Sequence, residues 1–177
     1  MQNMLANLRA RREDDERGFT LIELMVVVLI IAILIAIAIP TFLGAKSRAQ
    51  DKAAQSSLRN ALTNAKGIYT DQDSYGASSG ALVTGLTAAE PSLTFNATTS
   101  TTAKTVSVDV RSTTTVVMVA KSSSGNCFAI GDSANGPGTV FANLGSASCD
   151  PTSAPALPSS APTTANATSG GGWAQAW

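Results

Sequence analysis

An uninterrupted apolar segment constrains this chain more than any other feature of its sequence. It covers residues 19–39, in which Thr20 and Glu23 are the polar side chains and everything from Leu24 onward is apolar. A helix of this length is roughly 31 Å long, close to the roughly 30 Å hydrocarbon core of a bilayer. We therefore expect a single helix that lies in a membrane.

The residues before this helix form a polar leader, 1–18. Its charges balance one another, four on each side: Arg9, Arg11, Arg12 and Arg17 against Glu13, Asp14, Asp15 and Glu16. A secretory signal peptide has its small-residue cleavage site after a shorter apolar stretch. Here the small residue, Gly18, comes before the apolar stretch. Cleavage at Gly18 would remove the leader and leave the hydrophobic helix on the product.

The segment that follows, 40–69, has the period of an amphipathic helix. Its apolar residues recur mostly at spacings of three and four: Ala49, Ala53, Leu58, Ala61, Leu62, Ala65, Ile68 and Tyr69. Pro40 and Gly44 are the main helix breakers. We predict one long helix with a bend or weak point near them, whose apolar half lies in lipid and whose amphipathic half packs on a globular head.

Residues 70–149 are predicted to form that head. Four segments are strand candidates: 106–110, 113–120, 127–130 and 139–142. Arg111 and Ser112 are expected to turn the first pair into a hairpin. The stretch from Thr70 to about Lys104 is rich in small polar residues without a clear period and is interpreted as a long loop.

The last 28 residues, 150–177, are rich in Ser, Thr, Pro and Gly, and 150–172 are typical of an irregular or disordered tail. Trp173 and Trp177 are spaced four apart. Two interpretations stay open for them: they dock on the head, or they flank a flexible end.

Composition argues against most enzymes and against nucleic-acid binding. Twelve Lys and Arg balance twelve Asp and Glu, and there is no His. The chain thus has no overall basic field to attract phosphates, and it lacks the commonest general base and metal ligand. Asp71 and Asp73 near the helix end are expected to form a solvated turn rather than a calcium site. We expect no catalytic residue, metal or cofactor, and no specific nucleic-acid site.

Glu23 is the informative side chain of the apolar helix. An acid inside a bilayer costs about 2.5 to 3.5 kcal/mol at mid-membrane on insertion scales, so it normally has a partner or a function. Cleavage after Gly18 would create one, because the new amine of Phe19 lies one turn from Glu23. The amine could belong to the same chain or to a neighbour in a helix bundle. The alternative is that Glu23 reaches the headgroups at the end of the span.

The residues around this acid closely resemble the processing and assembly motif of type IV pilins and related pseudopilins. They read Arg17-Gly18-Phe19-Thr20-Leu21-Ile22-Glu23-Leu24-Met25-Val26-Val27-Val28. The resemblance implies that a prepilin peptidase cuts after Gly18 and that Phe19 becomes the N-methylated terminus. It also implies that Glu23 guides docking into a filament. Pro40 matches a family proline near a helix segment that unwinds in filaments.

The same resemblance implies an α+β fold, with the long N-terminal helix packed on a small antiparallel sheet. It implies a structural subunit of a type IV pilus whose partners are other copies of itself, the prepilin peptidase, the pilus assembly platform and membrane lipid. The prepilin would lie in the bacterial cytoplasmic membrane with its N-terminus inside, and the product at the cell surface. Adhesion, motility and DNA uptake are family roles.

Three alternatives to a major pilin remain. One is a minor pilin at the filament tip, and another is a pseudopilin of a type II secretion system, which shares the motif. The third is a membrane-tethered receptor or enzyme whose helix is only an anchor. The chain has two cysteines, Cys127 and Cys149, and such a pair favours a pilin. A calcium-binding head without a cysteine pair would favour a pseudopilin.

Cys127 and Cys149 are expected to form one disulfide if the head is exported, which stabilises it by about 3 kcal/mol through restriction of the unfolded loop. Two buried free thiols are the alternative. A zinc site is disfavoured, because two Cys without His supply half of a zinc shell.

Overall fold

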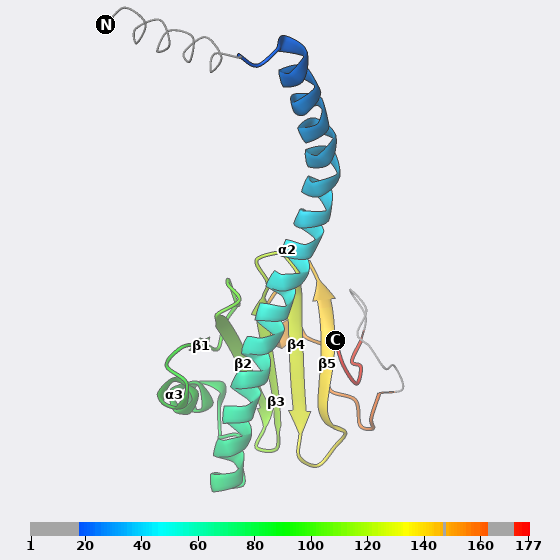
Figure 1. The fold of residues 1–177 in the computed structure, drawn as a ribbon. Coiled ribbons are helices and arrows are strands. Elements are labelled where there is room, and N and C mark those ends of the chain that lie inside the picture. The colour runs from blue at the N-terminus through cyan, green and yellow to red at the C-terminus, as the bar shows by residue number, and fades with distance from the viewer. Residues whose placement is uncertain (1–17, 147, 163–171) are drawn as a thin grey trace, which may run out of the picture. The chain divides into compact units, whose positions relative to one another are not determined.

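The computed structural model describes residues 18–146, 148–162 and 172–177, and it has an α+β fold (Figure 1). The chain divides into two units, Met1–Gly44 and Ala45–Trp177, which are described separately below. The elements are α2 Leu21–Gln72, α3 Ser79–Ala89, β1 Thr94–Asn96, β2 Thr105–Ser112, β3 Thr115–Lys121, β4 Cys127–Ser133, β5 Gly138–Gly145 and the 3-10 helix η1 Pro151–Ser153.

The apolar and amphipathic segments form one helix, α2, of 52 residues. The prediction of a single long helix is therefore confirmed, and the helix ends three residues beyond Tyr69. Pro40 lies inside it without interrupting it. Asp73, directly after the helix, has a φ of 51°. This left-handed conformation stops helix propagation.

In the second unit, one face of α2 is buried against the sheet. Its buried apolar residues are spaced four, three, one and three apart: Ala54, Leu58, Ala61, Leu62 and Ala65. The predicted face was wrong at its start, because Ala49 and Ala53 are exposed. Ala53 lies five residues before Leu58, about 140° around the helix from it. Ala54, four residues before Leu58, is the residue that faces the sheet.

The sheet has five strands in the order β1-β2-β3-β4-β5. β1 pairs with β2 in parallel, and the other three pairs are antiparallel. Alternate residues along each strand point to opposite faces, so the sheet has two apolar clusters. The first lies under α2 and α3 and includes Val106, Met118, Phe128 and Ile130. The second, on the opposite face, includes Val119, Val140, Ala142 and Trp173.

The predicted loop from Thr70 to Lys104 was wrong, since α3 and β1 lie within it. The Ser78 hydroxyl caps α3 by accepting a hydrogen bond from the Ala81 amide. Leu82 and Leu86, four residues apart, are the buried side chains of this helix. Apart from Val83, the remaining residues of α3 are Ser, Thr, Gly and Ala. The spacing of the two leucines was therefore not recognised in the sequence as that of a helix.

The predicted turn at Arg111 and Ser112 was also wrong. Strand β2 continues through both residues, and the chain turns at Thr113 and Thr114 instead. The β2–β3 register shifts between Val110 and Ser112, which marks a bulge at Arg111.

Arg111 holds the irregular segment after the sheet. Its guanidinium donates to the carbonyl oxygens of Pro151, Ala154 and Pro155 at 3.2, 2.7 and 2.8 Å. It also pairs with Asp109 at 3.2 Å. Apart from η1, the described residues 148–162 form no helix or strand, in keeping with the predicted irregular tail. The rest of that prediction, 163–171, lies outside the described residues.

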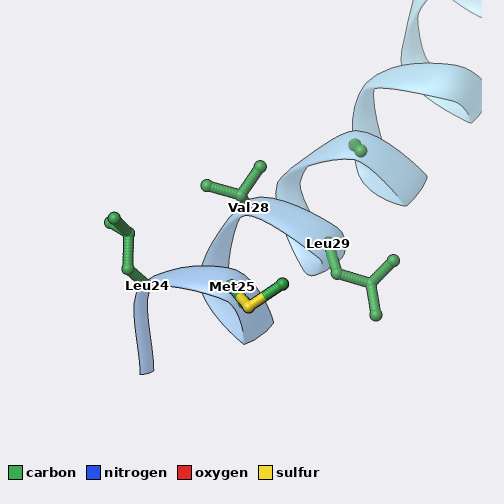
Figure 2. A pocket seen from close by; sticks show the side chains of 5 residues that line it. Leu24, Met25, Val28 and Leu29 are labelled. Carbon is green, nitrogen blue, oxygen red and sulfur yellow. The ribbon is translucent and has the colours of Figure 1, made fainter. Parts of the chain in front are cut away.

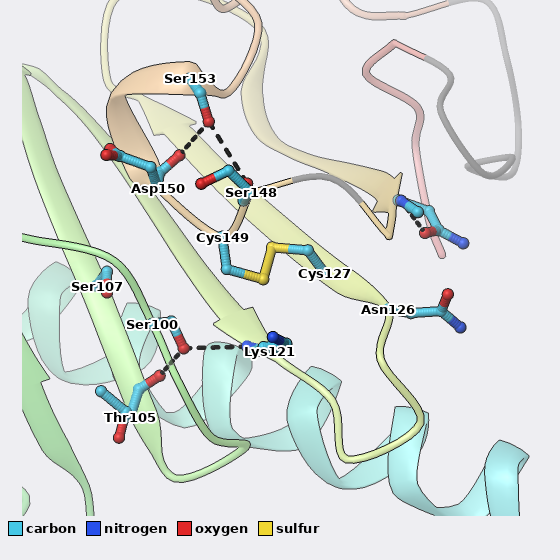
Figure 3. The surroundings of a disulfide bond; sticks show 12 residues. Ser100, Thr105, Ser107, Lys121, Asn126, Cys127, Ser148, Cys149, Asp150 and Ser153 are labelled. Carbon is cyan, nitrogen blue, oxygen red and sulfur yellow. Dashed lines mark hydrogen bonds between the residues drawn. A yellow bond between two sulfur atoms is a disulfide. The ribbon is translucent and has the colours of Figure 1, made fainter.

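A disulfide joins Cys127, at the start of β4, to Cys149 (Figure 3). The two Cα atoms are 5.5 Å apart and both residues are buried. Beside it, the carbonyl oxygen of Cys149 accepts a hydrogen bond from the Ser100 amide at 2.8 Å. The Ser100 hydroxyl donates to the Thr105 carbonyl at 2.5 Å and accepts from the Lys121 amide at 3.0 Å. The connection before η1 is thereby fixed to β2, β3 and β4.

The two tryptophans dock on the head, which decides between the two interpretations of the sequence. Trp173 is buried and donates to the carbonyl oxygens of Pro155 and Ala156. Trp177 donates to the Ala142 carbonyl oxygen at 3.0 Å.

Candidate processing and assembly site

The acid of the apolar helix is bound to the residue at the start of that helix. Helix α2 begins at Leu21, so Thr20 is at the N-cap position and Glu23 is the third helical residue. Glu23 Oε2 accepts hydrogen bonds from the Thr20 amide at 2.9 Å and from the Thr20 hydroxyl at 2.8 Å. In return, the Thr20 hydroxyl accepts from the Glu23 amide at 3.2 Å. These reciprocal bonds form a capping box.

The capping box gives Glu23 a partner within the uncleaved chain. It satisfies amide groups that would otherwise lack acceptors at the start of the helix, and the carboxylate also favours the positive end of the helix dipole. We did not identify Thr20 as a functional residue in the sequence, although the spacing of Thr and Glu three apart before an apolar run is the signature of this motif.

Gly18 and Phe19 precede the helix and are exposed. Phe19 is 88% exposed, and a Cβ placed on Gly18 would meet no atom within 4 Å. A peptidase that cuts between them would thus find an accessible bond next to a residue without a side chain. The nitrogen of Phe19 is part of that peptide bond in the full chain, so its pairing with Glu23 as a free amine remains a prediction.

The apolar side chains of α2 in the first unit are uncovered. Those of the large residues in 19–39 are between 48 and 88% exposed. Figure 2 shows Leu24, Met25, Val28 and Leu29 projecting from the helix around a shallow hollow, which Ala32 also lines. Within the described residues, α2 is the one helix long and apolar enough to cross a membrane. This surface needs either lipid or other apolar surface to cover it.

Pro40 leaves one carbonyl group without its usual partner. Proline has no N–H, so the Ala36 carbonyl lacks the helical hydrogen bond it would receive from residue 40. The next hydroxyl, that of Thr41, donates to the Ile37 and Ala38 carbonyl oxygens at 3.2 and 2.9 Å. These bonds tie the Thr41 side chain to the turn around Pro40, but they do not reach the Ala36 carbonyl oxygen.

The candidate residues Asp71, Asp73, Cys127 and Cys149 lie in the second unit, outside the apolar segment. Asp71 is the next-to-last residue of α2, which ends at Gln72. Asp73 follows the helix in a left-handed conformation. Within residues 18–146, 148–162 and 172–177, no three His, Cys, Asp or Glu side chains cluster as metal ligands would. Cys127 and Cys149 are joined in the disulfide.

Fold and site together define an apolar helix that is long enough to cross a membrane and has a capped acid in its first turn. It is continuous with a helix that packs on a mostly antiparallel sheet. This α+β arrangement is consistent with a pilin-like fold. The model of the prokaryotic N-terminal methylation motif matches residues 14–39, and the chain thus carries the type IV prepilin signature. The motif supports a prepilin of the pilin or pseudopilin type and implies processing by a prepilin peptidase. Comparison with curated proteins and with solved structures finds no match for this chain.

Proposed function

We propose that this protein is a structural subunit of a type IV pilus, made as a membrane-anchored prepilin. A prepilin peptidase cleaves it after Gly18, and Phe19 becomes the N-methylated terminus. The leader, 1–18, is then lost. The mature chains assemble into a helical filament on the cell surface through the pilus assembly platform, and the protein has no enzymatic role.

The observation that carries the proposal is the uncovered apolar helix, residues 19–39, joined to a head with its own core. Every large apolar side chain of this segment is at least 48% exposed. In the membrane lipid covers it, and in a filament the same segments of other copies cover it. Because lipid tails are as apolar as the helices, the exchange gains little hydrophobic free energy. Helix packing and a specific polar contact must therefore direct assembly.

Glu23 supplies that contact. Before cleavage Thr20 holds its carboxylate at 2.8 and 2.9 Å. After cleavage the amine of Phe19 offers a charge-assisted hydrogen bond, which is roughly twice as strong as a neutral one. When the amine of one chain meets Glu23 of the next, burial of the helices satisfies both charges. Such a head-to-tail contact does not close on itself, and it generates an open helical polymer.

The disulfide supports an exported head. Disulfides persist in oxidising compartments and are rare in the cytosol, and Cys127 is joined to Cys149 here. With the leader inside, the head lies outside the cytoplasmic membrane before assembly. The second candidate function is a pseudopilin of a type II secretion system, because the methylation motif at 14–39 serves both classes. Long surface filaments built from this protein would favour the pilus. If cells make no such filaments, and deletion of the protein stops the secretion of other proteins, the pseudopilin is favoured.

Substitution of Glu23 tests the proposal. Glu23→Ala removes the carboxylate, and Glu23→Gln keeps an oxygen that accepts from Thr20 but removes the negative charge. We expect both variants to insert into the membrane at wild-type levels and to form at least tenfold fewer surface filaments, counted by electron microscopy. Asp71→Asn, which removes an exposed carboxylate outside the apolar segment, is the matched control. Normal filaments from Glu23→Ala would contradict the role proposed for the acid.

A further inference from the structure

Residues 172–177 pair with β5, one of the two edge strands of the sheet. Strand β5 is the last in the sheet order, and such an edge exposes unpaired amide and carbonyl groups that another chain can pair with. Here Phe141 and Ala174 form an antiparallel bridge. The Phe141 amide donates to the Ala174 carbonyl oxygen at 2.9 Å, and the Ala174 amide donates to the Phe141 carbonyl oxygen at 2.7 Å.

The two tryptophans of this segment contact opposite faces of the sheet. Trp173 belongs to the apolar cluster on the face away from α2. Trp177 packs against the cluster under α2, with its ring centroid 4.7 Å from that of Phe141 and 6.2 Å from that of Phe128. The guanidinium of Arg59 lies 5.0 Å from the Trp177 ring. The segment therefore contacts both faces of the sheet at β5, one through each tryptophan.

Both indole N–H groups are also satisfied by backbone carbonyl oxygens. Trp173 donates to Pro155 and Ala156, and Trp177 donates to Ala142 on β5. A buried Trp is usually held by such a bond, and two of them fix the position of the segment along the strand. Main-chain pairing with side-chain anchors is the arrangement by which a sheet edge recognises an extended peptide.

The chain that leads to this segment is longer than its position requires. The Gln175 side chain donates to the Pro162 carbonyl oxygen at 3.0 Å, so the segment returns to the place where the preceding described residues end. Nine residues, 163–171, connect the two parts. They are Thr, Ala, Asn, Ser and Gly, without a large apolar side chain. Nine residues reach up to roughly 30 Å when extended, far enough to place the segment on an adjacent molecule.

We propose that the β5 edge is a peptide-docking surface and that the partner it fits is a second copy of this chain, whose residues 172–177 take the same position. An identical segment makes identical contacts, so exchange between copies costs little beyond linker entropy. Neighbouring heads are then joined by a strand that belongs to one and completes the sheet of the other. The exchange needs two heads and does not depend on filament formation.

The test uses the full chain and a variant that ends after Gly171, both in detergent. A fluorescent peptide of residues 172–177 should bind the shortened variant with saturable anisotropy, and the intact chain at least tenfold more weakly, because its own segment competes. A peptide with Ala174→Pro lacks the amide that donates to Phe141 and should lose at least tenfold in affinity. Gln175→Ala changes an exposed side chain that contacts Pro162 and not β5, so it is the matched control and should bind nearly as tightly as the original peptide.

Exchange between copies is measured by mixing the shortened variant with a tagged intact chain. Co-purification should exceed that of a tagged Ala174→Pro chain at least fivefold, while contacts through the apolar helix are equal in both. If the shortened variant fails to fold by circular dichroism, a protease site is inserted after Gly170 and the folded chain is cut, and displacement of the retained segment is measured instead. Absence of peptide binding or displacement, or equal co-purification with the Ala174→Pro chain, would overturn the proposal.

Discussion

The Tyr75 hydroxyl donates a 2.6 Å hydrogen bond to Asp132 Oδ2, which ties the loop after α2 to strand β4. Asp132 is 4% exposed. Its other oxygen lies 2.7 Å from Lys66 Nζ and accepts from the Thr139 hydroxyl at 2.7 Å. A buried carboxylate is tolerated because α2, the following loop and β5 each supply a partner.

Removal of this acid should destabilise the head strongly. Asp132→Ala leaves the buried Tyr75 phenol without its acceptor and removes the ion-pair partner of the half-exposed Lys66 ammonium, and we expect a loss of about 3 kcal/mol in the free energy of unfolding. Tyr75→Phe removes a single bond to a charged group and should cost about 1.5 to 3 kcal/mol. Fluorescence of Trp173 and Trp177 during denaturation measures both losses. Asp71→Asn, an exposed control, should change stability by less than about 0.5 kcal/mol.

The same contact predicts a loss of stability in alkali. Burial, and then the hydrogen bond to Asp132 and its negative charge, raise the pKa of Tyr75 well above its ordinary value of 10.0. A raised folded-state pKa means that the unfolded chain releases the phenolic proton first. The stabilising contribution of Tyr75 is therefore complete below about pH 10 and falls above it, by up to about 1.4 kcal/mol per pH unit.

Denaturation curves of the wild type and of Tyr75→Phe between pH 9 and 11 separate the phenol from every other group that titrates there. The wild type should lose more stability over this range than the variant does. Parallel losses in the two proteins would contradict the role given to Tyr75.

Arg111 should control the order of the segment that follows the sheet. Arg111→Met removes the donors to Pro151, Ala154 and Pro155, so we expect a loss of about 1 to 3 kcal/mol and at least tenfold faster proteolysis within 150–162. Limited proteolysis with mass spectrometry locates the cuts. Lys104→Met, at an exposed position, should leave the digestion pattern unchanged.

The disulfide should contribute stability without being required for the first unit. The double variant Cys127→Ala and Cys149→Ala opens a loop with a sequence separation of 22, and we expect a loss of about 3 kcal/mol in the head. Membrane insertion, tested by carbonate extraction, should be unaffected because residues 19–39 are intact. An unchanged denaturation midpoint in the double variant would show that the bond adds nothing to stability.

The capping box predicts a graded response at Thr20. Thr20→Ser keeps a hydroxyl that accepts from the Glu23 amide, whereas Thr20→Val has nearly the same shape without it. We expect the valine variant to lose about 1 kcal/mol of helix stability at this end. Amide exchange of the first turn of α2 in micelles should quicken about fivefold in Thr20→Val and stay near wild type in Thr20→Ser.

The elements that were predicted from the sequence are those that local pattern determines. The apolar segment 24–39 carries no charge and satisfies its backbone in lipid by forming a helix, and the β-branched residues of β2 and β3 favour extended backbone. The helix α3 was missed because Leu82 and Leu86 are the two buried side chains that mark it. Its other residues include Ser79, Gly80, Thr84, Gly85 and Thr87, which do not favour a helix.

The features that were not predicted from the sequence depend on contacts between residues far apart in the chain. The partners of Asp132 come from positions 66, 75 and 139, and no spacing rule brings them together. The docking of Trp177 likewise depends on Phe141 at the sheet edge, which strand periodicity alone does not reveal. Thr20 differs from these, since its capping motif was present in the sequence and was not recognised.

The mass of the N-terminal peptide in sheared cell-surface material tests the central claim most directly. The account predicts a peptide that begins at Phe19, heavier by one methyl group and without residues 1–18, recovered from polymeric material. Recovery of the exported chain with its leader still attached, and only as a single molecule, would contradict it.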